Sequence, residues 1–105
     1  MTTDTANNND ALYQHLASEA GEITWPELEP HFARGVLIVV SDKLDLIDVA
    51  TCAAQDERVE MENWMQQGLV ERARDDHAHR WNLSKPLFRA VVLAPWVLVQ
   101  EARRH

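Results

Sequence analysis

The sequence predicts an α+β fold in which helices pack on a small β-sheet. Five consecutive aliphatic residues, Val36–Val40, are bounded by Gly35 and Ser41, and such a run predicts a strand buried on both faces. Segments on either side repeat their apolar residues at helical spacing, which predicts amphipathic helices around this strand. Hydrophobic residues make up 46% and charged residues 26% of the 105 residues, values typical of a globular domain.

Two helices are predicted before the strand. Residues 1–9 are polar and low in complexity, which predicts a disordered N-terminal tail. Asp10 then caps a first helix that runs to about Ala20. Thr24 is the expected N-cap of the second helix, and Glu27, three residues later, has the spacing of its capping-box partner.

Two more helices are predicted directly after the strand. Residues Leu44–Gln55 carry a broad apolar stripe, and Arg58–Gln67 forms the second helix after a short break. Gly68 stands where a helix C-terminus favours glycine. The side chains of the second helix expected to face inward are Met61, Trp64 and Met65.

The C-terminal third is predicted to supply the rest of the sheet. Leu69–Ala73 is a short candidate strand, and Asp76–Trp81 a short helix capped by the preceding aspartate. Leu87–Leu93 predicts a strand, and Trp96–Gln100 a further extended apolar run. We expect the sheet to combine these C-terminal strands with Val36–Val40.

Composition excludes several classes of protein. No apolar run approaches the roughly 18 residues that a membrane span needs. Residues 1–10 lack the basic and apolar regions of a secretory signal. A single cysteine, Cys52, excludes an internal disulfide framework and a cysteine-rich zinc site. We therefore expect a cytoplasmic protein without cofactor or membrane association, folded as one α+β domain over residues 10–105.

The predicted order of elements resembles a winged helix-turn-helix, with Leu44–Gln55 and Arg58–Gln67 as the helix pair and a modified wing between Glu71 and Pro86. Several stretches of the chain have a more specific likeness: Trp25-Pro26-Glu27-Leu28, Ala33-Arg34-Gly35, Leu44–Ala50, Trp64 with Gly68-Leu69, and Phe88 through Ala94-Pro95-Trp96 to Glu101. Together they resemble a bacterial "domain of unknown function" family, number 2288. The resemblance implies a small bacterial cytosolic protein and carries over no catalytic residue.

Charge argues against the DNA-binding role that a winged helix suggests. The second helix of the pair would enter the major groove, yet Glu57, Glu60 and Glu62 surround its single Arg58. Such a helix would repel the phosphates that supply most non-specific affinity. Residues 71–105 hold seven basic and four acidic residues, so nucleic-acid binding through this basic third stays an alternative.

Three polar side chains are candidates for a ligand pocket. His31 and Arg34 lie between two apolar elements, and Asp48 or Asp45 could join them. Converging groups of this kind could hold a small molecule or support an enzyme. An arginine–carboxylate pair that joins two helices is the favoured interpretation of the same residues.

Other chemically interesting residues favour structural interpretations. Asp75 and Asp76 precede His77 and His79, but no third metal ligand is evident, so we expect helix-capping aspartates and exposed histidines. Cys52 has apolar neighbours and no basic residue within a turn, which predicts a structural thiol.

The leading hypothesis is a non-enzymatic protein-interaction or regulatory module, with a homodimer as one form it could take. The candidate contact surface is the C-terminal extended run, because an exposed strand can pair with a partner. Its candidate residues are Trp96, Val97 and Val99. Burial of both valines within the monomer would contradict this site.

Overall fold

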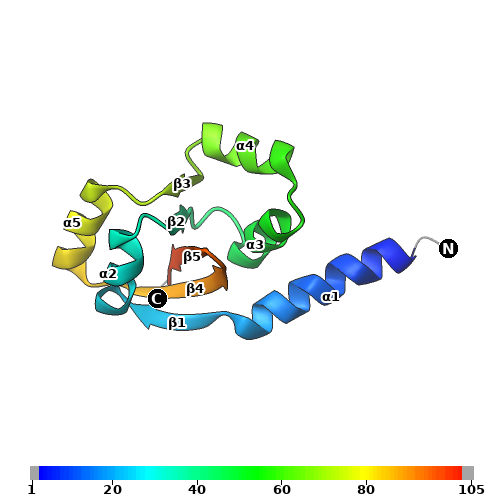
Figure 1. The fold of residues 1–105 in the computed structure, drawn as a ribbon, viewed down its shortest axis with the longest axis horizontal. Helices are drawn as coiled ribbons and strands as arrows, with labels where there is room; N and C mark the ends of the chain where they lie inside the picture. The colour runs from blue at the N-terminus through cyan, green and yellow to red at the C-terminus, as the bar shows by residue number, and fades with distance from the viewer. Residues whose placement is uncertain (1–2, 103–105) are drawn as a thin grey trace.

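The computed structural model describes the backbone of residues 3–102 and the side chains of residues 10–102. Within them, five helices pack on a mixed five-stranded sheet with the strand order β1-β4-β5-β2-β3 (Figure 1). The predicted α+β fold is confirmed. The elements in chain order are α1 (Thr3–Glu19), β1 (Gly21–Thr24), α2 (Trp25–Ala33), β2 (Leu37–Val40), α3 (Leu46–Ala54), α4 (Arg58–Gln66), β3 (Val70–Arg72), α5 (Asp75–Ser84), β4 (Leu87–Leu93) and β5 (Trp96–Glu101).

The sheet is built around β5. This strand pairs antiparallel with β4 and parallel with β2, and the short strands β1 and β3 form the two edges. The predicted strands are all present, whereas β1 was not predicted. Its four residues fall between the end of one helix and the capping box of the next, and only pairing with the distant β4 makes them a strand.

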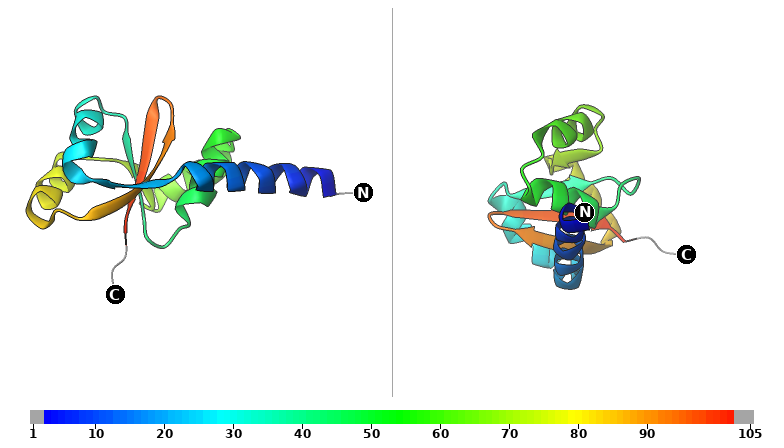
Figure 2. Two further views of the ribbon diagram at one scale, coloured as in Figure 1. Left: turned by 90° about the horizontal axis from the view of Figure 1, so that it is seen from below. Right: turned by 90° about the vertical axis from the view of Figure 1, so that its right-hand side faces the viewer.

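Helices cover both faces of the sheet, so the molecule has three layers (Figure 2). Successive strand side chains point to opposite faces, which lets one sheet serve two cores. Helices α1 and α3 cover one face around Leu16, Ile47 and Leu98. Helices α2 and α5 cover the other around Trp25 and Trp81, whose ring centroids are 5.3 Å apart.

Two predicted helix boundaries are confirmed in detail. The Glu27 carboxylate accepts a hydrogen bond from the Thr24 backbone N–H at 3.1 Å, as the capping box requires. Gly68 follows the end of α4 with a φ of 74°, a left-handed conformation that glycine adopts without a steric penalty.

The winged-helix part of the fold prediction is not confirmed. Helices α3 and α4 form the predicted pair, but the segment expected to be a modified wing contains the ten-residue helix α5. Trp81 of α5 is fully buried against the sheet, so burial of this side chain favours a packed helix over an exposed hairpin. Strand β2 also pairs in parallel with β5, whereas a wing is a hairpin of antiparallel strands.

The N-terminal helix is longer than predicted. Helix α1 begins at Thr3, so residues 3–9 of the predicted tail are helical, and residues 1–2 lie outside the described residues. No helix among residues 3–102 is both long enough and apolar enough to cross a membrane.

Candidate functional site

The predicted ligand pocket does not form. A guanidinium nitrogen of Arg34 and Nδ1 of His31 lie 2.8 Å apart at the end of α2. Asp48 is exposed on α3, which covers the opposite face of the sheet, and the alternative Asp45 is hydrogen-bonded to Tyr13. The prediction was wrong because His31 and Arg34 lie on one side of the sheet and Asp48 lies on the other. The expected arginine–carboxylate pair is likewise replaced by an arginine–histidine contact.

The predicted interaction strand is wrong for two of its three residues. Strand β5 has partners on both sides, and Val97 and Val99 are only 4% and 0% exposed. An apolar run near the end of the chain was expected at an edge, whereas pairing with β2 and β4 places it at the centre. Trp96, at the start of β5, is 36% exposed and remains available.

His77 is buried, contrary to the expectation of an exposed histidine. Its Nδ1 accepts a hydrogen bond from the Arg74 backbone N–H at 3.0 Å, which places the ring proton on Nε2. That nitrogen lies 3.5 Å from the Glu71 carboxylate. Burial lowers the pKa of His77, and the nearby Arg74 charge lowers it further. With both ring nitrogens engaged, His77 fixes the start of α5 and offers no free base for catalysis.

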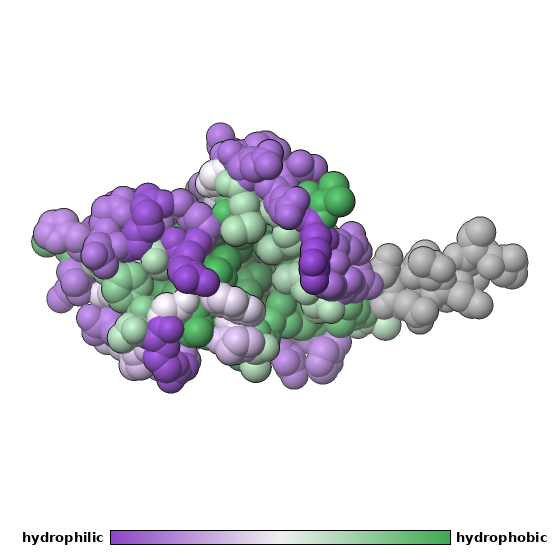
Figure 3. Space-filling view, turned by 45° about the horizontal axis from the view of Figure 1, so that its top comes forward, coloured by the Kyte–Doolittle hydropathy of each residue, from purple (hydrophilic) through white to green (hydrophobic). Residues whose placement is uncertain are grey.

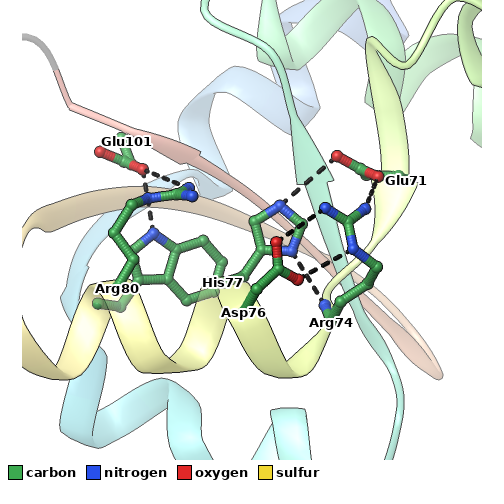
Figure 4. Close-up of polar contacts among 7 residues, drawn as sticks. Glu71, Arg74, Asp76, His77, Arg80 and Glu101 are labelled. Atoms are coloured by element: carbon green, nitrogen blue, oxygen red, sulfur yellow. Dashed lines mark hydrogen bonds and ion pairs between the residues drawn. The ribbon is translucent and has the colours of Figure 1, made fainter.

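A polar pocket of about 420 Å³ lies beside His77, at the carboxyl ends of β2 and β5. The Trp81 indole N–H donates to the Glu101 carboxylate at 3.0 Å, and Arg80 lies 3.7 Å from the same oxygen (Figure 4). The charged side chains around the pocket therefore pair with one another. They connect α5 to the sheet.

A second hollow, of about 820 Å³, lies between α1, α3 and α4. Asp48, Glu57 and Glu60 make its lining acidic, and Cys52 lies among them. Burial raises the pKa of the Cys52 thiol, and the neighbouring carboxylates raise it further. The thiol therefore stays protonated at neutral pH, and a protonated thiol is a poor nucleophile. In the part of the chain with described side chains, no three potential metal ligands come together.

A largely apolar groove of about 730 Å³ lies between α4 and the sheet. It lies where the C-terminal end of α3 and helix α4 meet the sheet beside the turn between β4 and β5. Figure 3 looks onto this hollow, whose floor is apolar and whose surroundings are hydrophilic. The apolar lining residues are Ile38, Val70, Leu93, Trp96 and Leu98 from the sheet, Ala94 from the turn between β4 and β5, Ala53 and Ala54 from α3, and Met61 and Met65 from α4.

Large apolar side chains are exposed on both sides of this groove. Met65, on α4, is 54% exposed, which contradicts the prediction that it faces inward. Trp96 lies across the groove, with the Arg72 guanidinium 5.3 Å from the centre of its ring. None of the residues of α4 is buried. The groove is therefore open apolar surface at the margin of the core that contains Leu98.

Comparison with known proteins places the chain in a family. Residues 11–101 match the model of a family described as "Protein of unknown function (DUF2288)". The chain belongs to this family. No curated protein matches it. This member of the DUF2288 family is similar to PA1075 from Pseudomonas aeruginosa, whose solution structure was determined by NMR. The two sequences are 39% identical, the match covers 90% of this chain and 92% of that chain, and the TM-score is 0.77. The match supports the fold.

Sequence reasoning found one part of the groove and missed the rest. Trp96 was singled out because it starts an apolar run, and Met65 because it has helical spacing. Nothing in the sequence shows that α4 and the turn between β4 and β5 face each other across a hollow, because this depends on how distant segments pack. Arg72 was counted only among the basic residues of the C-terminal third.

Proposed function

We propose that this DUF2288 protein is a protein-interaction module whose contact site is the groove between α4 and the sheet. The observation that carries the proposal is the exposure of Trp96 and Met65 on facing sides of one apolar hollow. Exposed apolar patches that are rimmed by polar residues are typical of interaction sites, and buried tryptophans at such sites often dominate binding. The proposal keeps the protein in the cytosol, as the sequence predicts.

Nucleic-acid binding is less well supported as a function. The single arginine of α4, Arg58, lies 3.3 Å from the carboxylate of Asp56 and has glutamates around it. Arg74 pairs with Glu71 and Asp76, so its charge is also partly neutralised. Arg103 and Arg104, counted in the basic third, lie outside the described residues. Binding through phosphate contacts needs free cationic groups on one face.

Capture from the native cytosol tests the proposed function. We expect the full-length protein to retain a protein partner at moderate salt, and Trp96→Ala to lose it. Leu83→Ala is the matched control, because Leu83 is 75% exposed on α5, on the other side of the sheet. Circular dichroism checks that each variant is folded. Capture that survives Trp96→Ala, or that disappears after nuclease treatment, would contradict the proposal.

A further inference from the structure

We propose that the groove is occupied by a second copy of this chain, related by a twofold axis that brings Arg72 of each copy to Glu62 of the other. The inference rests on the proposed function and deepens it, because it names the partner. It follows from the charges on the groove, from its apolar side chains and from the packing of α4.

The groove carries one free charge of each sign. Arg72 lies over Trp96 on the sheet side, and Glu62 lies on α4. Neither forms an ion pair with another residue among those with described side chains. By contrast, the other charged lining residues are paired: Arg58 with Asp56, and Glu71 with Arg74. The lining therefore presents a cation on one side and an anion on the other.

This pattern is self-complementary under a twofold axis. In such an interface every contact occurs twice: if one residue of the first copy contacts another residue of the second, the same two residues also meet with the copies exchanged. Arg72 and Glu62 would then form two equivalent ion pairs. The same rotation would place Met65 of each copy against Trp96 of the other, so that both exposed apolar side chains are covered in both copies.

Helix α4 gives a second reason for a symmetric partner. It is nine residues long, and its Met61 and Trp64 pack half-buried against one core, whereas Met65, which lines the groove, is 54% exposed. Short helices derive most of their stability from packing of an apolar face. A second copy seated in the groove would extend that packing to Met65 on both α4 helices at once.

Charge reversal tests the pairing directly. We expect the wild-type chain, of 12.0 kDa, to sediment at twice this mass at micromolar concentration and physiological salt. Arg72→Glu places two like-charged pairs across the axis, and so does Glu62→Arg. For each variant alone, the dissociation constant of the dimer should increase at least about tenfold, which corresponds to about 1.4 kcal/mol of binding free energy. An equimolar mixture of the two variants restores both attractive pairs and should form the heterodimer.

Charge-matched controls separate this effect from the change in net charge. Lys85→Glu, directly after α5, and Glu29→Arg on α2 change the net charge by the same amount, at exposed positions by the two helices that cover the other face of the sheet. Both should dimerise like the wild type. A wild-type chain that stays monomeric, single reversals that dimerise normally, or a mixture that stays monomeric would overturn the inference. A monomer that still captures a cytosolic protein through Trp96 would overturn it and leave the proposed function standing.

Discussion

At the scale of single residues, burial assigns the roles of the polar side chains. His77 is 4% exposed and its two ring nitrogens face a backbone N–H and the Glu71 carboxylate. The sequence places His77 and His79 on either side of Ala78 and gives no sign of which is buried, because burial depends on how α5 meets the sheet. The ring stacks on Trp81, with centroids 5.3 Å apart, so it belongs to the core.

The buried histidine makes stability depend on pH. Because the pKa of His77 is lowered in the folded protein, the unfolded chain binds the proton first, near its ordinary pKa of 6.5. We therefore expect the free energy of unfolding to decrease as the pH falls through 6.5, and to level off once the pH is below the folded pKa. His77→Gln keeps an acceptor for the Arg74 N–H and cannot titrate. Urea unfolding at several pH values should show a smaller decrease for His77→Gln. Equal decreases in both proteins would contradict this role.

At the scale of elements, helix α3 depends on its N-cap. The Asp45 carboxylate accepts a hydrogen bond from the Ile47 backbone N–H at 2.9 Å and another from the Tyr13 hydroxyl at 2.6 Å. One side chain therefore both starts α3 and joins it to α1. The bond between Asp45 and Ile47 is local and could be predicted from the sequence. The bond between Asp45 and Tyr13 joins residues that are far apart in the sequence, so it could not.

Removing this cap should destabilise the protein measurably. We expect Asp45→Ala to lower the free energy of unfolding by about 1–2 kcal/mol, since the variant loses the cap and the bond to Tyr13. Tyr13→Phe removes only the second bond and should cost about 1 kcal/mol or less. Chemical denaturation of both variants provides the measurement. A stability of Asp45→Ala equal to that of Tyr13→Phe would show that the cap contributes nothing.

At the scale of the whole molecule, the arrangement of layers creates the candidate site. The sequence predicted most strands and helices because each has a local period or cap, as in the Val36–Val40 run and the Thr24 capping box. It did not predict that β5 would lie at the centre, because the pairing of Trp96–Glu101 with β2 and β4 joins distant segments. The groove depends on this pairing, which brings Trp96 and the turn between β4 and β5 beside α4.

The central claim is that the groove between α4 and the sheet is the contact surface. Its most direct test compares two ¹H–¹⁵N NMR spectra of the labelled protein. The first is recorded on the dilute protein alone, and the second after addition of its captured partner or of excess unlabelled chain. We predict that the indole signal of Trp96 and the backbone signals of Met65 and Arg72 change most. The indole signals of Trp25 and Trp81, which are buried and hydrogen-bonded, should stay in place. Changes confined to the acidic hollow around Cys52 or to α5 would contradict the account.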